Sequence, residues 1–357
     1  MVEQFVIEFR LASYTVKSRR YVDFSEAGFV VPEGAPDGFR ARMERLFALY
    51  GELLAMGVPK EDARFVLPYC FRSNFYMTLN AREFVHLVGA MTRGRGRRFP
   101  EIRMLGESLA KQFEELYPGV LDQSRFPECA EPQIPTEFCF GSASTGAAEI
   151  LSSPDCGRIL GEAMRFSGRL GMREALVRDA RPRELELLNF VFRVENASLA
   201  CVTHFARHRM QSPLYMPSAD ALARGNYVLP ESIAEIPSAR ELYEGVFREE
   251  AEFAREMLKR GLRPEDICYL ALSGHTADML FSMNARELLH FMKLRICRRA
   301  QWEIRGIALQ MLRLLAALEP ELFSHYGASC LVDGRCPEGK LTCGRPIERS
   351  EIMGGNA

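Results

Sequence analysis

The sequence predicts a protein that combines helices with strands and consists of two related halves. Residues 39–57 carry apolar side chains at helical spacing, which predicts an amphipathic helix. The alternating run at residues 190–194, Phe-Val-Phe-Arg-Val, indicates a strand. Residues 77–91 and 281–295 both contain Asn-Ala-Arg-Glu followed by a histidine in the same register. This repetition indicates an internal duplication.

The duplication extends beyond this segment, because Pro59–Asp62 is similar to Arg263–Asp266. The stretch between the two halves is rich in proline and glutamate, which is typical of a linker. We therefore expect a first copy that is shortened at its N-terminus, a linker, a second copy and a cysteine-containing tail: residues 1–120, 121–138, 139–325 and 326–357.

Composition narrows the class of protein. The 357 residues are 47% hydrophobic and 26% charged, which is ordinary for a globular protein with one or two sizeable cores. The formal net charge of -1 gives no reason to expect nucleic acid or an anionic membrane as a partner. No apolar run approaches the roughly 18 residues that span a bilayer, and no signal peptide is evident. We therefore expect a cytoplasmic protein whose ten cysteines are reduced.

The chemically densest stretch is Arg207-His-Arg-Met-Gln-Ser212. Apolar residues at helical spacing precede it, with Asn196 or Ser198 as the predicted N-cap and Pro213 as a predicted terminator. This reading places the two arginines in the last helical turn, where cations suit the negative end of the helix dipole. Taken alone, the stretch is equally well explained as a basic helix end.

Each Asn-Ala-Arg-Glu segment is predicted to begin a helix, with the asparagine as N-cap and the glutamate completing a capping box. The arginine and the histidine of each segment are four residues apart and so share one helix face. This face is either a solvated polar stripe or part of a binding site. The residues concerned are Asn80, Arg82 and His86 in the first copy, and Asn284, Arg286 and His290 in the second.

Together, Arg207–Ser212, Asn284–Arg295 and Ala300–Arg305 resemble the flavin-dependent thymidylate synthases. That family carries a signature of the form Arg-His-Arg-x-x-Ser-x-Asn-x-x-Ser-x-Arg-Tyr. The resemblance covers nearly all of 180–320 and most of 1–120. It implies an α+β fold in two tandem copies, each a sheet flanked by helices. It also implies active sites between subunits of a homotetramer, which a homodimer of this duplicated chain would imitate.

The resemblance implies that the protein converts dUMP to dTMP. NADPH reduces bound FAD, and methylene-tetrahydrofolate supplies the one-carbon unit. Arginines suit such a site because the guanidinium stays charged and binds phosphate through a bidentate fork. Two alternatives stay open: C5 alkylation of a different pyrimidine nucleotide, and a homologue that binds flavin or nucleotide without turnover.

Neither copy keeps the whole signature, and the losses are complementary. The second copy keeps Arg207, His208, Arg209 and Ser212. The first copy keeps the other part, at Arg10, Ser13, Ser18, Arg20 and Tyr21. The arginine that precedes Val-Leu-Pro survives only in the first copy, as Arg64, and the arginine that ends the Asn-Ala-Arg helix survives only as Arg295. This pattern favours one composite site built from both copies over a decaying duplicate.

The resemblance assigns roles to individual residues. Those expected to be catalytic are Arg64, Arg207 and Arg295. Those expected to contact the nucleotide are Ser18, Arg20, Arg64, His204, Arg207 and Arg295. Those expected to contact the flavin are Asn80, Arg82, His86, Arg207, His208, Arg209, Asn284, Arg286 and His290. Two departures from the family pattern stand out: Arg181 and Arg183 replace a His-x-Thr motif, and His204 replaces a glutamine.

Three cysteines in the tail form the last pattern. Cys330, Cys336 and Cys343 are separated by five and six residues, with glycine and proline between them. This spacing suits thiolate ligation of zinc or iron, with Cys129 or Cys139 as a fourth ligand, although it matches no standard zinc finger. The alternative is a set of free surface thiols.

Overall fold

A computed structural model describes residues 1–122, 126, 133–169 and 173–354. These residues form two compact units, which are described separately. Unit 1 comprises residues 1–144 and 217–276, and unit 2 comprises residues 145–216 and 277–357. The units divide the chain differently from the two expected copies, because residues 217–276 were expected in the second copy but pack in unit 1.

Unit 1 is mainly helical, with one antiparallel pair of strands, β1 and β2. Its elements are α1 Val2–Ile7, β1 Ala12–Val16, α2 Phe39–Ala55, α3 Lys60–Ala63, the 3-10 helix η1 Arg64–Val66, β2 Phe75–Leu79, α4 Ala81–Thr92, α5 Pro100–Leu116, α9 Ser218–Arg224, α10 Glu231–Ala234, α11 Pro237–Lys259 and the 3-10 helix η4 Pro264–Leu270.

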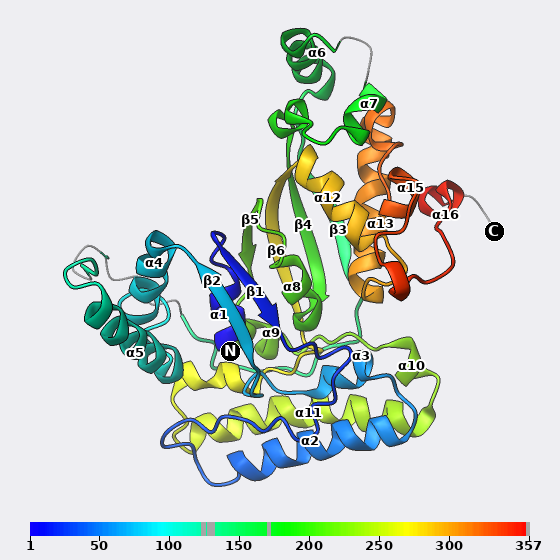
Figure 1. Ribbon diagram of the computed structural model, residues 1–357. Coiled ribbons are helices and arrows are strands. Elements are labelled where there is room, and N and C mark those ends of the chain that lie inside the picture. Colours follow the sequence, from blue (N-terminus) through cyan, green and yellow to red (C-terminus); the bar gives the residue numbers. More distant parts are fainter. Residues whose placement is uncertain (123–125, 127–132, 170–172, 355–357) are drawn as a thin grey trace. The chain divides into compact units, whose positions relative to one another are not determined.

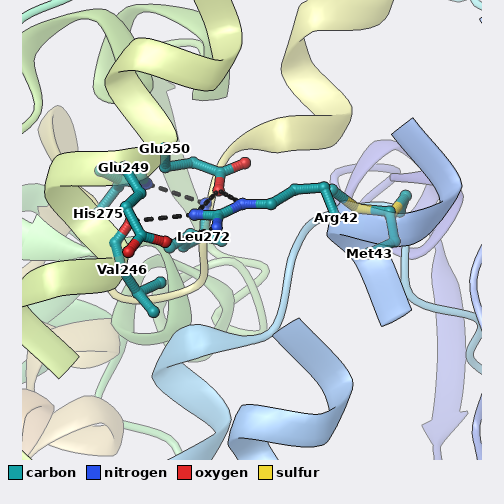
Figure 2. Close-up of polar contacts among 8 residues, drawn as sticks. Arg42, Met43, Val246, Glu249, Glu250, Leu272 and His275 are labelled. Carbon is teal, nitrogen blue, oxygen red and sulfur yellow. Dashed lines mark hydrogen bonds and ion pairs between the residues drawn. The ribbon is translucent and has the colours of Figure 1, made fainter. Parts of the chain in front are cut away.

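Helices α2 and α11 lie side by side in unit 1 (Figure 1). Arg42 of α2 joins them, because its Nε donates to Glu250 Oε2 at 2.8 Å and its Nη1 to Glu249 Oε2 at 2.7 Å (Figure 2). Its Nη2 also donates to the carbonyl oxygen of Val246 at 3.3 Å. Since Glu250 is fully buried, this contact lies inside the helix interface and compensates the charge there.

Unit 2 is built on a four-stranded sheet in the order β3-β4-β6-β5, with β3 antiparallel to β4 and β5 antiparallel to β6. Its elements are β3 Ala147–Ser152, α6 Cys156–Ser167, α7 Arg173–Arg178, the 3-10 helix η3 Arg183–Leu187, β4 Asn189–Ser198, α8 Leu199–Phe205, β5 Gln211–Tyr215, β6 Thr276–Asn284, α12 Ala285–Arg295, α13 Trp302–Leu318, α14 Pro320–Phe323, α15 Ser329–Val332, the 3-10 helix η5 Gly339–Leu341 and α16 Arg349–Met353.

One hydrophobic core fixes the helices of unit 2 on its sheet. Phe192 of β4 stacks on Phe281 of β6 with ring centroids 5.6 Å apart, and Phe205 of α8 packs against both Phe281 and Phe291 of α12. These side chains are buried and together contribute several kcal/mol of apolar burial. The core therefore holds the end of α8 against α12, which positions the site residues that follow α8.

The mixed helix and strand content agrees with the expected α+β class, and strand β4 includes the predicted 190–194 run. One expectation was wrong. Helix α8 ends at Phe205, so Arg207 lies after the helix and not in its last turn. Pro213 does not end a helix either but lies within β5, the edge strand of the sheet. Proline has no backbone N–H to donate. An edge strand tolerates it because one side of the strand has no neighbouring strand to accept such a hydrogen bond.

The two Asn-Ala-Arg-Glu segments have the same local structure. In each, the asparagine lies where a strand leads into a helix: Asn80 follows β2 and Asn284 is the last residue of β6. Ala12 is opposite Leu79 in the first strand pair, and Gln211 is opposite Met283 in the second. Asn80 caps α4 by accepting from the backbone N–H of Glu83 at 2.9 Å. The capping asparagine of α12 accepts in the same way from the third residue of its helix, at 2.8 Å. The predicted caps are confirmed.

Candidate active site

The second copy contributes its site residues from the turn between α8 and β5. Ser198 starts α8, since its hydroxyl accepts from the backbone N–H of Cys201 at 2.9 Å; of the two predicted caps, it is the one used. The helix ends at Phe205, and the chain turns before it enters β5. Arg207 and Arg209 are exposed in this turn, whereas His208 between them is buried.

A hydrogen-bonded chain links Arg295, His208 and Glu287 inside unit 2. Arg295 Nε donates to His208 Nε2 at 2.9 Å, and His208 Nδ1 lies 3.1 Å from Glu287 Oε1. Because a guanidinium can only donate, His208 Nε2 must accept, and the ring proton is assigned to Nδ1, which donates to the carboxylate. Arg295 Nη2 also donates to the carbonyl oxygen of His204 at 3.2 Å. These contacts fix the guanidinium at the end of α12.

Burial and charge keep His208 neutral. Its side chain is 3% exposed, and burial, followed by the charges of Arg295 and His290, holds its pKa well below the ordinary value. Burial also raises the pKa of Glu287, against the opposing effects of His290 and Arg286. A neutral imidazole can accept from Arg295 and donate to Glu287 simultaneously, which an imidazolium cannot do.

Two of the other predicted flavin-binding side chains, those of Asn284 and Arg286, form hydrogen bonds or ion pairs within the protein. Asn284 caps α12, and Arg286 forms an ion pair with Glu186 of η3. His290 is exposed, and its ring centroid lies 5.8 Å from that of His208. His290 therefore lies beside the hydrogen-bonded chain, on the exposed side of α12.

The first copy gathers its candidate arginines around Glu61 in unit 1. Arg20 forms an ion pair with the Glu61 carboxylate, and Arg64 Nε donates to the Glu61 carbonyl oxygen at 2.9 Å. The Ser18 hydroxyl accepts from the backbone N–H of Arg20 at 3.3 Å. Arg64 is only 2% exposed. Ser18, Arg20 and Arg64 are thus brought together by one short segment of α3 and η1.

The remaining first-copy candidates lie at the start of α4. Asn80 is used as the helix cap, while Arg82 and His86 are exposed. His86 Nδ1 lies 4.0 Å from the Glu83 carboxylate, within the same helix. Nothing in these contacts distinguishes a flavin-binding face from a solvated one, so their assignment stays a prediction.

Sequence comparison connects this geometry to known proteins. The family described as "Thymidylate synthase complementing protein" matches residues 1–119 and 141–321. The chain belongs to this family. The flavin-dependent thymidylate synthase of Geobacter sulfurreducens is 36% identical over 172 residues, which cover 47% of this chain and 74% of that protein. The protein of the same name from Pyrococcus abyssi is 34% identical over 166 residues, covering 44% of this chain and 68% of the relative.

Among solved structures, the UMP/dUMP methylase PolB from Streptomyces cacaoi, bound with 5-Br dUMP, is 19% identical to this chain with a TM-score of 0.47. The match covers 52% of this chain and 95% of PolB. None of the helices in the described part of this family member is both long and apolar enough to cross a membrane.

Two carboxylates in these clusters were not predicted from the sequence. The Glu61 carboxylate pairs with Arg20, while Arg64 contacts only the Glu61 backbone carbonyl oxygen, and the Glu287 carboxylate orients His208. Glu287 was expected to complete a capping box, whereas its carboxylate contacts an imidazole from a segment 79 residues away. The sequence did carry a signal for a further role of Glu287, because both Asn-Ala-Arg-Glu segments have glutamate at this position, followed by apolar residues.

The expectation of a single metal ion at the tail cysteines is not supported. Within residues 1–122, 126, 133–169 and 173–354, no three histidine, cysteine, aspartate or glutamate side chains are arranged to hold a metal ion. Cys129 lies outside the described residues, and Cys139 is an exposed free cysteine of unit 1. Cys330, Cys336 and Cys343 are free cysteines of unit 2.

Proposed function

We propose that this chain is a flavin-dependent thymidylate synthase that methylates C5 of dUMP to give dTMP. FAD is the proposed cofactor, NADPH the reductant and methylene-tetrahydrofolate the carbon donor. Family membership and the names of the curated relatives support this assignment. The observation that carries it is the buried chain from Arg295 through His208 to Glu287, since it orients a cation at the position where the family resemblance expects one.

The proposal includes a tandem duplication in which each copy supplies half of one site. Two separate regions of the chain match the same family, and the antiparallel strand pairs that lead into the Asn-Ala-Arg-Glu helices have equivalent registers. Arg20 and Arg64 are the proposed contribution of the first copy. Arg207, Arg209 and Arg295 are that of the second. The pairing is made either within one chain or between two chains of a homodimer.

Cations are needed at two places in the proposed reaction. The 5′-phosphate of the nucleotide is a dianion, which arginine binds in a bidentate manner, and Ser18, Arg20, Arg207 and His204 are the proposed nucleotide contacts. Negative charge also develops on the pyrimidine ring, and a preoriented guanidinium stabilises such charge best where water is excluded. Arg64 and Arg295 are suited to this second role, because Arg64 is buried and Arg295 is held by His208.

His208 and Glu287 act as positioning residues in this proposal. Their hydrogen bonds hold the Arg295 guanidinium in one orientation, so its charge need not reorganise when the substrate reacts. Bound FAD would supply the hydride chemistry. The residues proposed to contact it are Asn80, Arg82, His86, Arg207, His208, Arg209, Asn284, Arg286 and His290.

A second candidate function is C5 alkylation of a different pyrimidine nucleotide. It is favoured by one departure from the family pattern: His204 stands where a glutamine is expected. The backbone carbonyl oxygen of this residue accepts from Arg295, so the replaced side chain belongs to a residue that contacts a proposed catalytic arginine.

The test begins with purified full-length protein. Bound FAD, dUMP-stimulated NADPH oxidation in the presence of methylene-tetrahydrofolate, and dTMP formation are the expected results, together with rescue of a thymidine auxotroph. Arg165→Ala, which removes an exposed ion pair with Glu162, is the matched control and should keep full activity. Turnover of another pyrimidine nucleotide but not dUMP would favour the second candidate. Flavin binding without turnover of any pyrimidine nucleotide would indicate a non-catalytic homologue.

A further inference from the structure

Four cysteines of unit 2 line one cavity of about 180 Å³. Cys297 follows α12, Cys330 lies in α15, and Cys336 and Cys343 come from the tail beyond it. All four are free cysteines; Cys336 is exposed and the other three are half-buried. Cys297 was not part of the pattern found in the sequence, because 32 residues separate it from Cys330. Folding therefore adds a fourth thiol to the three tail cysteines.

The tail is shaped to bring these thiols to the cavity. Gly334, Gly339 and Gly344 have φ angles of 67°, 53° and 67°, a left-handed conformation that other residues rarely adopt. Each marks a turn in the segment that carries Cys336 and Cys343. With so little regular secondary structure, this segment owes its path to these turns.

The surroundings favour negatively charged sulfur. The described lining contains four cationic residues and one acidic residue, Glu338; the cations are Lys293, Arg298, Arg299 and Arg345. The backbone N–H of Arg299 donates to Cys297 Sγ at 3.5 Å. A metal centre would hold the cysteine sulfurs as thiolates, whose negative charge these cations would offset.

A single metal ion does not fit this arrangement, but a larger inorganic group does. One zinc ion requires its ligands to converge at about 2.3 Å from a common point, and no three candidate ligands in the described chain do so. An iron–sulfur cluster distributes its four cysteine ligands around a body several ångströms across, and N–H···S bonds and nearby charge are typical of its surroundings. Four cysteines around one cavity, the N–H···S bond to Cys297 and the cationic residues of the lining agree with such surroundings.

We propose that unit 2 binds an iron–sulfur cluster through Cys297, Cys330, Cys336 and Cys343. The site differs from the sequence expectation in its ligand set, because Cys297 replaces a linker cysteine, and in its occupant, because a cluster replaces a single ion. Its position ties the tail to the end of α12, two residues after Arg295. The proposal does not depend on which nucleotide the protein methylates.

The test uses full-length protein purified without oxygen, and the same protein reconstituted with ferrous iron and sulfide. Iron and acid-labile sulfide are measured per chain, and electron paramagnetic resonance is recorded after reduction, because flavin absorbance overlaps that of a cluster. Equal amounts of iron and sulfide are expected, at about two to four of each per chain. Protein that takes up neither after reconstitution, or that holds stoichiometric zinc in the same site, would overturn the proposal.

Variants assign the ligands. Serine replacements of Cys297, Cys330, Cys336 and Cys343, each made singly, should remove most of the iron and sulfide. Cys139→Ser is the matched control, since Cys139 is exposed and does not line the cavity, and it should keep the full content. Circular dichroism and FAD content show whether each variant folds. An equal loss in the Cys139 variant would contradict the assignment, and the wild-type iron and sulfide content remains decisive if a serine variant does not fold.

Discussion

At the scale of single residues, the arginine at the end of α12 depends on a histidine and a carboxylate for its orientation. Arg295 and His208 are joined by a 2.9 Å hydrogen bond, and Glu287 holds the other side of the imidazole. An arginine in water reorients freely, whereas this one is fixed before substrate arrives. In the proposed reaction, that preorganisation is the part of catalysis supplied by the protein itself.

We expect Arg295→Ala to lower kcat/KM for dUMP by roughly 30- to 1000-fold, which corresponds to about 2 to 4 kcal/mol of transition-state stabilisation. Arg295→Lys should recover little of this loss, because a single ammonium cannot reproduce the fork that bonds both His208 and the His204 carbonyl oxygen. Steady-state kinetics and FAD content check both variants. An Arg295→Ala enzyme of normal rate would remove Arg295 from the proposed catalytic set.

Glu287 should matter for stability as well as for orientation. Glu287→Ala leaves the His208 N–H buried without its acceptor, which costs about 1 to 3 kcal/mol of unfolding free energy. Glu287→Gln keeps an acceptor oxygen and should lose less. Urea unfolding measures both, with Glu162→Ala as a control, because Glu162 forms only an exposed ion pair with Arg165. Equal losses for the alanine and glutamine variants would show that the hydrogen bond to His208 is unimportant.

At the scale of elements, α2 and α11 are joined across their buried faces by Arg42 and Glu250 (Figure 2). Burial raises the pKa of Glu250 from its ordinary value of 4.5 to about 7, although Arg42 acts in the opposite direction. The effect of desolvation on the Glu250 pKa is therefore larger than the effect of the ion pair with Arg42. In other proteins too, the desolvation penalty of a buried ion pair can equal or exceed the Coulombic attraction between its charges.

This shift predicts how stability depends on pH. The folded protein holds a proton on Glu250 up to about pH 7, whereas the unfolded chain releases it near 4.5, so stability falls as the pH rises between these values and then levels off. The slope is at most about 1.4 kcal/mol per pH unit for one proton. Denaturant unfolding of the wild type and Glu250→Gln from about pH 5 to 8 isolates this group. Parallel curves for the two proteins would contradict the prediction.

At the scale of the whole molecule, the proposed composite site limits how many sites an assembly can contain. Each chain holds one set of surviving arginines, divided between the two copies. A homodimer that imitates the family tetramer should therefore bind one nucleotide per chain, and closed twofold symmetry is the usual arrangement for such an assembly. Titration with dUMP or FAD and measurement of the mass in solution check this expectation. Two equivalent sites per chain, or a stable monomer, would contradict it.

The composite site also predicts that alanine substitutions in the two different copies lower the reaction rate by similar factors. Arg20→Ala and Arg207→Ala should lower the rate by similar factors, roughly 30- to 1000-fold, although they lie in different copies. Mixing the two variants then locates the pairing: activity returns if the arginines meet between chains, and does not if they meet within one. A large loss in only one variant would show that a single copy carries the site.

The amino-acid sequence by itself determined the features that depend on neighbouring residues and on family pattern. The helix caps at Asn80 and Asn284 and the strand at residues 190–194 were predicted correctly, because each rests on a short segment. The family membership was also predicted correctly, from several short motifs spread along the chain. The end of α8 was misplaced by reading Pro213 as a terminator. That error is also local in origin, since proline breaks helices but is tolerated in an edge strand, and only the sheet order shows which applies.

Only the tertiary structure decided which distant side chains meet. His208 and Glu287 are 79 residues apart in sequence, and Arg42 and Glu250 are 208 apart, so no periodicity or capping rule joins them. The same is true of Cys297, which reaches the cavity of the tail cysteines because α12 and the tail pack in one unit. Such contacts arise when the hydrophobic core closes, since burial then forces each polar group to find a partner among whatever the fold brings near.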